Sequence, residues 1–140
     1  MFIPLKLALI GYGKMGQLIE QLAIEKGHTI VAKIHSKSNE SDWAQLQSAD
    51  VAIEFTQPEA VLNNIKKCFS FNVPVVVGTT AWYNHLDEVI EWQKQANAGL
   101  LTASNFSIGV NVFFKLNQVL AHLMDPINGY EVSLQEIHHI

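Results

Sequence analysis

The sequence is poor in cysteine, in charge and in long apolar runs, and each shortage excludes a class of protein. The single cysteine, Cys68, rules out a disulfide framework and fits a reducing compartment, so we expect a cytoplasmic protein. No apolar stretch approaches the roughly 20 residues that a membrane-spanning helix needs, so no membrane association is expected. The apolar N-terminus is about one strand long and runs straight into a glycine loop, which predicts a buried strand and not a signal peptide.

Charged residues are few and form no basic cluster. They make up 16% of the chain, nine basic against thirteen acidic, which gives a net charge of -4. Lys66-Lys67 is an ordinary pair on a helix face, so nucleic acid is not an expected partner. The 49% of hydrophobic residues, in a chain of 140, is enough to bury the core of one domain.

Cys68 itself falls in a helical pattern with Val61, Ile65 and Phe69. A free cysteine in such a stripe usually behaves as a small buried hydrophobe. The pattern therefore predicts a packed thiol, with a nucleophile as the alternative.

Strand-like runs alternate with helical periodicity along most of the chain. Strands are predicted at Leu5–Ile10, Thr29–Ile34, Val51–Phe55, Val73–Val77 and Leu100–Ala103. Helices are predicted at Lys14–Lys26, at Asp42–Gln47, from Pro58 to Phe71-Asn72, at Leu86–Asn97 and at Gly109–Met124. The first helix should end at Gly27 and bury one stripe of residues, which are Met15, Leu18, Ile19, Leu22 and Ala23. The second helix should be capped by Ser41. This alternation predicts an α/β fold, a Rossmann-type doubly wound parallel sheet with helices on both faces.

The last segment has a different pattern. Tyr130, Val132 and Leu134 alternate with polar neighbours, which is typical of a half-buried strand, predicted here over Tyr130–Ile140. We therefore expect residues 1–127 to form one domain and residues 128–140 to begin a second, α+β domain that is truncated.

A glycine-rich motif follows the first predicted strand and opens the first helix. It reads Gly11-Tyr12-Gly13-Lys14-Met15-Gly16 and matches G-x-G-x-x-G in the context that this motif requires. Gly11 would permit the tight turn, Gly13 the approach of a pyrophosphate, and Gly16 close packing of the helix on the strand. The helix N-terminus would supply free N–H groups to the phosphates. The motif therefore predicts that residues 1–127 are a dinucleotide-binding domain. The alternative is a glycine-rich turn that binds nothing.

The end of the second strand decides between the two nicotinamide cofactors. The fingerprint usually has an acidic residue there, which binds the ribose hydroxyls. This sequence has Lys33, His35, Ser36 and Lys37 instead. No carboxylate repels a 2′-phosphate at this place, which favours NADPH over NADH unless these are ordinary solvated loop residues.

Small and hydrogen-bonding residues follow the other predicted strands. In a doubly wound sheet, ligands bind beyond the carboxyl ends of the strands. The predicted cofactor contacts there are Phe55 and Thr56 of Glu54-Phe55-Thr56, then Gly78, Thr79 and Thr80, and then Ala103, Ser104, Asn105 and Phe106. Each group alone would also suit an ordinary turn. Trp82-Tyr83 comes directly after the second group, either as packing or as a wall of the cleft.

The motifs together resemble one enzyme family. In order they are the loop Gly11–Gly16, Glu54-Phe55-Thr56, Gly78-Thr79-Thr80, the run from Ser104 to Asn111, and Glu136-Ile137-His138-His139. This series is similar to the 4-hydroxy-tetrahydrodipicolinate reductase family, also called dihydrodipicolinate reductase, over essentially the whole chain. The family pattern continues with a lysine and an Asp-Ala-Pro-Ser-Gly-Thr stretch, which are absent here. Many members also carry an acidic residue where His35-Ser36 stand.

The resemblance implies roles for the double histidine: His138 as general acid/base and His139 as a substrate contact. Histidine titrates near neutral pH and suits proton transfer. Neighbouring strand residues point to opposite sides, so if both rings serve one substrate, either the backbone bends there or one ring acts from the far side. The same geometry makes the pair a poor metal chelate, and no metal is expected. Two solvated histidines are the plain alternative.

The resemblance also implies a reaction, which is the NADPH- or NADH-dependent reduction of a cyclic imine dicarboxylate in diaminopimelate and lysine biosynthesis. It implies a small-molecule substrate and a homo-oligomer, a tetramer in this family. Because the carboxylate-gripping stretch is absent, we expect this chain to bind cofactor without turnover. The alternatives are another NAD(P)-dependent dehydrogenase with the same front domain, and a dinucleotide-sensing module without catalysis.

Overall fold

The computed structural model describes residues 3–135 and 137 and divides the chain into two compact units. The first unit extends to Ser104 and contains the sheet. The second begins at Asn105 and contains one long helix, α5 (Ile108–Met124), whose first turn is capped by the Ser107 hydroxyl. In the described part of the chain, no helix is long and apolar enough to cross a membrane.

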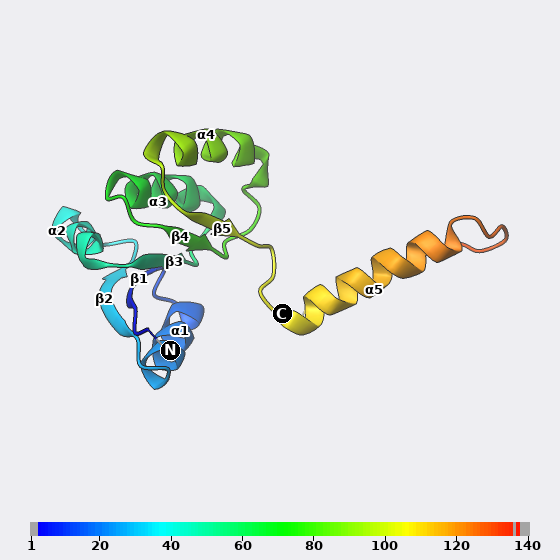
Figure 1. The fold of residues 1–140 in the computed structure, drawn as a ribbon, viewed down its shortest axis with the longest axis horizontal. Helices are drawn as coiled ribbons and strands as arrows, with labels where there is room; N and C mark the ends of the chain where they lie inside the picture. The colour runs from blue at the N-terminus through cyan, green and yellow to red at the C-terminus, as the bar shows by residue number, and fades with distance from the viewer. Residues whose placement is uncertain (1–2, 136, 138–140) are drawn as a thin grey trace. The chain divides into compact units, whose positions relative to one another are not determined.

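The first unit is built on a five-stranded parallel sheet (Figure 1). Its strands are β1 (Lys6–Ile10), β2 (Thr29–Ile34), β3 (Val51–Glu54), β4 (Val75–Val77) and β5 (Leu100–Thr102), in the spatial order β2-β1-β3-β4-β5. The chain moves outward from β1 on one side and then returns to build on the other, so the direction of winding reverses between β1 and β3. This confirms the predicted doubly wound sheet and places its ligand-binding switch point beside β1.

Helices cover both faces of this sheet. They are α1 (Lys14–Glu25), α2 (Glu40–Ala44), α3 (Pro58–Ser70) and α4 (Leu86–Ala96), with 3₁₀ turns at Gln45–Ser48 and Tyr83–His85. Figure 1 shows α3 and α4 together on one face and α1 on the other. The core fills the layer under α3, where Ile65 and Cys68 pack with strand residues such as Ile10 and Val75. Cys68 is fully buried there, as a packed thiol should be.

The predicted helix after β2 begins too late and has the wrong cap. Asn39, not Ser41, caps α2: its side-chain oxygen accepts hydrogen bonds from the backbone N–H groups of Ser41 (2.8 Å) and Asp42 (3.2 Å). The Asp42 carboxylate in turn accepts from the Asn39 N–H (2.8 Å). Only Asn39 has an acidic residue three positions later to complete this reciprocal capping box.

The predicted buried stripe of α1 is narrower than expected. Met15, Leu18 and Leu22 are exposed, whereas Gly16 and Ala23 are buried. The fully buried residues of α1 are thus small, and at Gly16 a Cβ would lie 2.2 Å from the Gly11 carbonyl oxygen.

The predicted strand over Tyr130–Ile140 does not form in its described part. Residues 130–135 and 137 have no regular secondary structure, and Val132 is 95% exposed. A strand exists only through hydrogen bonds to a neighbouring strand, and no such partner pairs with this segment among the described residues. The alternation of apolar and polar residues shows that the segment is amphipathic, but the predicted strand is wrong for its described part.

Candidate functional site

The loop between β1 and α1 requires two of its glycines for reasons internal to the chain. Gly11 has a φ of +94°, and a Cβ there would lie 1.9 Å from the Phe55 carbonyl oxygen. A Cβ on Gly16 would lie 2.2 Å from the carbonyl oxygen of Gly11. Gly16 therefore packs the start of α1 against the loop itself, and not against the strand as predicted. No other residue fits either position without moving backbone.

Gly13 is different, because no contact among the described residues requires it to be a glycine. Its φ of -88° and ψ of -155° are open to any residue, and a Cβ built on it has no heavy atom within 4 Å. It lies at the N-cap of α1, where backbone N–H groups lack helical partners. The bare backbone thus faces open space at the place where a pyrophosphate would approach.

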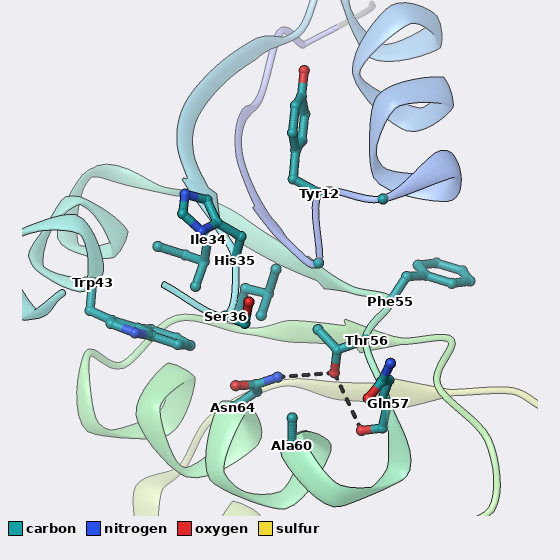
Figure 2. Close-up of a pocket in the computed structure, with 13 residues that line it drawn as sticks. Tyr12, Ile34, His35, Ser36, Trp43, Phe55, Thr56, Gln57, Ala60 and Asn64 are labelled. Atoms are coloured by element: carbon teal, nitrogen blue, oxygen red, sulfur yellow. Dashed lines mark hydrogen bonds between the residues drawn. The ribbon is translucent and has the colours of Figure 1, made fainter. Parts of the chain in front are cut away.

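A hollow of about 580 Å³, the first hollow, opens at the carboxyl ends of β1, β2 and β3 (Figure 2). This volume is in the usual range for small-molecule sites. It is lined by Ile10, Gly11, Tyr12, Gly13, Ile34, His35, Ser36, Trp43, Phe55, Thr56, Gln57, Ala60 and Asn64.

A second hollow of about 360 Å³ lies on the other side of the glycine loop. Its lining consists of Gly13, Lys14, Met15, Phe55, Thr56, Pro58, Gly78, Thr79 and Thr80. The two hollows share Gly13, Phe55 and Thr56, so Gly13 borders both. Gly78 is needed for packing, because a Cβ there would lie 2.1 Å from the Phe55 ring.

Polar contacts connect the floors of the two hollows. The Thr56 backbone N–H donates to the Thr79 hydroxyl oxygen (2.8 Å), and the Trp82 indole N–H donates to the Thr79 carbonyl (2.8 Å). Trp82 is 1% exposed, so it packs beneath the loop and does not form a wall of the cleft.

The carboxylate of Glu54 lies beneath this floor and not in the cleft. It is fully buried and accepts hydrogen bonds from the Thr56 hydroxyl and from Nδ2 of Asn64 (3.1 Å). Burial, and next to it the charge of Glu54, raises the pKa of the Cys68 thiol to about 12. The thiol is therefore neutral at physiological pH, which removes the nucleophile alternative for Cys68.

Tyr12 and Lys33 are bound together by an acidic residue of α1. The Tyr12 hydroxyl donates to the Glu20 carboxylate, and Lys33 Nζ lies 2.6 Å from Glu20 Oε1. The hydrogen bond from Lys33, with that from Tyr12, lowers the pKa of Glu20, and the same bond raises the pKa of Lys33. Lys33 is thus already paired with a carboxylate, which leaves His35 and Lys37 as the basic side chains of the loop after β2.

The loop after β2 is held by its own hydrogen bonds. Nδ1 of His35 accepts from the Lys37 backbone N–H (3.2 Å), and the His35 N–H donates to the Ser38 hydroxyl (3.1 Å). With Nδ1 used as an acceptor, a neutral His35 carries its proton on Nε2. His35 and Ser36 then line the first hollow as predicted.

The structure brings most of the predicted site residues together. All of those in the glycine loop except Gly16, and those after β2, β3 and β4, line one hollow or both. Neither lining includes Ala103 or Ser104; Asn105 and Phe106 belong to the second unit, and His138 and His139 lie outside the described residues. The roles of these six stay predictions. Among the described residues, no group of three or more His, Cys, Asp or Glu side chains could hold a metal ion.

Several lining residues were not predicted. They are Ile10, Ile34, Trp43, Gln57, Pro58, Ala60 and Asn64. A signal was available for Asn64, a polar residue on the otherwise apolar stripe of α3 between Val61 and Cys68. No signal was available for Trp43, because only the turn of α2 decides that it faces the first hollow.

The winding of the sheet, the glycine loop and the hollows at the switch point define a Rossmann-type α/β domain, the class that binds dinucleotides at this edge. Solved structures show the same fold. One is a Bacillus subtilis protein described as a presumed oxidoreductase, with a TM-score of 0.61 and 15% identity over 86% of this chain and 40% of that one. Another, from Desulfitobacterium hafniense and described as a presumed NADPH-dependent oxidoreductase, has a TM-score of 0.59 and 13% identity over 74% of this chain and 35% of that one.

Sequence comparison narrows the class to one family. The family described as dihydrodipicolinate reductase, N-terminus, matches residues 5–106. The 4-hydroxy-tetrahydrodipicolinate reductase of Christiangramia forsetii is 43% identical over 97% of this chain, and that of Staphylococcus carnosus is 35% identical over 96%. The chain therefore belongs to the dihydrodipicolinate reductase family, as its motifs indicated. It spans 56% of the length of each of these two relatives.

Proposed function

We propose that this chain is the nicotinamide-dinucleotide-binding part of an NAD(P)H-dependent 4-hydroxy-tetrahydrodipicolinate reductase. The reaction is the reduction of a cyclic imine dicarboxylate to tetrahydrodipicolinate, on the diaminopimelate route to lysine. The observation that carries the proposal is Gly13, whose bare backbone borders both hollows and is required by no steric contact among the described residues. The names of the sequence relatives support the choice of reaction.

The residues present fit such a cofactor. The pyrophosphate would lie over Gly13 at the N-terminus of α1, where free N–H groups point outward. The chain contains no arginine, so its cationic contacts to an anion must come from lysine and histidine, beside backbone N–H and hydroxyl donors. The adenosine half would occupy the first hollow, between His35-Ser36 and apolar Trp43, and the nicotinamide half would extend toward Thr79 and Thr80 in the second.

The chain's own residues would bind and orient, and the reduced cofactor would supply the hydride. We propose that His138 donates the proton and that His139 contacts the substrate, since histidine changes charge near neutral pH. Ala103 to Phe106 would complete the nicotinamide side. A small-molecule substrate, a homo-oligomeric, tetrameric whole protein and a cytoplasmic location belong to the same proposal, and the single buried, free Cys68 fits a reducing compartment.

Replacing Gly13 tests this proposal. In Gly13→Val the new side chain enters open space, so the fold should survive with a fall in melting temperature of no more than about 5 °C, the cost of a poorer N-cap residue on α1. The dissociation constant for NADPH should rise at least tenfold, about 1.4 kcal/mol. Gly11→Ala is the contrasting variant: its Cβ would meet the Phe55 carbonyl, so it should lose stability first. Unchanged NADPH affinity in Gly13→Val, measured by calorimetry, would place the cofactor elsewhere.

A further inference from the structure

Glu54 is a buried carboxylate in the core of the sheet. Burying its charged or polar oxygens lowers the stability of the fold, and an apolar residue would pack there without that loss. The side chain is 0% exposed, and its Oε2 atom has no hydrogen-bond partner among the described residues. A buried, unpaired oxygen destabilises a fold, and a well-packed apolar residue of similar volume is often as stable or more stable. Such a group in a native core calls for a functional explanation.

We propose that Glu54 is a positioning residue for the dinucleotide site, one that orients Asn64 and Thr56 so that the first hollow presents hydrogen-bond acceptors to the ligand. The inference rests on the proposed function, because it assigns a role within that site. Glu54 lines neither hollow and would touch no ligand.

The direction of the hydrogen bonds carries the argument. Glu54 Oε1 accepts a hydrogen bond from the Asn64 side chain, so the amide turns its NH₂ group inward and its oxygen away from Glu54. Asn64 Nδ2 lies 3.1 Å from Glu54 Oε1 and 3.1 Å from Thr56 Oγ1. Figure 2 shows the Asn64 oxygen on the opposite side of the amide, toward Trp43. At Asn64 the first hollow is therefore lined by a hydrogen-bond acceptor, the amide oxygen, and not by the NH₂ donor.

Thr56 is oriented in the same way. Its hydroxyl proton is given to Glu54, and its oxygen accepts from Asn64 Nδ2 (3.1 Å), which leaves one lone pair as an acceptor. Its backbone N–H is fixed to the Thr79 hydroxyl (2.8 Å). Thr56 lines both hollows, which extends the influence of Glu54 across the shared floor. Groups recognised by such a floor are hydrogen-bond donors: ribose hydroxyls and the exocyclic amine of adenine.

The Glu54→Leu variant removes the carboxylate that accepts hydrogen bonds from Asn64 and Thr56 and keeps a side chain of similar volume. In Glu54→Leu we expect the dissociation constant for NADPH to rise about tenfold, because Asn64 and Thr56 lose the group that orients them. The melting temperature should stay equal or rise, because the buried unpaired oxygen is gone. Glu54→Gln keeps an oxygen that can accept both hydrogen bonds, so its affinity should stay within about threefold of the parent.

Two controls separate positioning from plain core packing. Val89→Ala empties space in the core on α4, away from both hollows, and should lower the melting temperature without changing NADPH affinity. In the Asn64→Ala background, Glu54→Leu should cost less affinity than in the parent chain, because one of the residues it orients is gone.

The measurements are calorimetric titrations with NADPH, thermal melts, and hydrogen exchange of the Asn64 side-chain amide in the free protein. We expect that amide to exchange slowly in the parent and in Glu54→Gln, and quickly in Glu54→Leu. A Glu54→Leu chain that binds NADPH as tightly as the parent would overturn the inference and leave the proposed function standing. A parent chain that binds no NADPH would overturn both. An affinity loss of the same size in Val89→Ala would show that binding merely follows stability, and would also overturn the inference.

Discussion

Three glycines within six residues serve three different physical needs. Gly11 is needed for its left-handed φ, and Gly16 for its closeness to the Gly11 carbonyl. Gly13 has neither need, and its lack of a side chain leaves the backbone at the start of α1 open toward both hollows. The motif predicted all three from sequence, yet it gave the wrong partner for Gly16, because the distance between two loop atoms is set by the folded turn and not by the pattern.

A titration of Glu20 tests a second feature at the scale of single residues, which is its ion pair with Lys33. Hydrogen bonds from Lys33 and Tyr12 lower its pKa below the ordinary value of 4.5. Its contribution to stability is therefore fully present above that value and is lost as the pH falls through the lower, folded pKa. In Lys33→Gln, a carboxyl NMR titration should show the pKa of Glu20 moving up toward 4.5. A value that does not move would mean that the ion pair is not formed in solution.

At the scale of an element, the sequence predicted the wrong N-cap residue for α2, Ser41 in place of Asn39. One variant at each position compares their contributions to stability. Asn39→Ala removes the acceptor for two backbone N–H groups and should cost about 1 kcal/mol, a fall in melting temperature on the order of 5 °C. Ser41→Ala removes only a hydroxyl that donates to Asn39 (2.6 Å), so its loss should be clearly smaller. Equal losses in urea denaturation would contradict the observed capping box.

We expect the loop between β2 and α2 to set the preference between NADPH and NADH. It presents His35 and Lys37, has no carboxylate facing the first hollow, and has Lys33 already paired with Glu20. NADPH should therefore bind at least as tightly as NADH, and its advantage should shrink with added salt, because the 2′-phosphate contact is exposed. Lys37→Gln should reduce the advantage further. A clear preference for NADH at low salt would show instead that His35 and Ser36 serve the ribose hydroxyls.

Hydrophobic periodicity predicted the helices and strands well where a segment is buried by the elements next to it in the sheet or layer. Val75–Val77 is apolar throughout and lies inside the sheet, and α3 buries the stripe of Val61, Ile65 and Cys68. Periodicity failed where burial depends on a distant partner. Val132 and Leu134 alternate correctly but pair with no strand among the described residues, and the large apolar residues of α1 face outward because only its small residues approach the sheet.

At the scale of the whole first unit, the order of the strands creates the site. Because β1 lies beside both β2 and β3, the loops that follow these three strands meet at one edge and enclose the first hollow. That edge was predictable from the alternation of strands and helices. The remaining lining was not, since Trp43 and Ala60 reach the hollow only through the way α2 and α3 lie on the sheet.

The central claim is that one dinucleotide binds across Gly13 and fills both hollows. The most direct test is a titration of the isotopically labelled 140-residue chain with NADPH, followed through its backbone amide NMR signals. We predict saturable binding of one NADPH per chain, with the largest shifts in residues 11–16, at Thr56 and at Thr79-Thr80. Binding that leaves the signals of the glycine loop unmoved, or no saturable binding at all, would contradict the account.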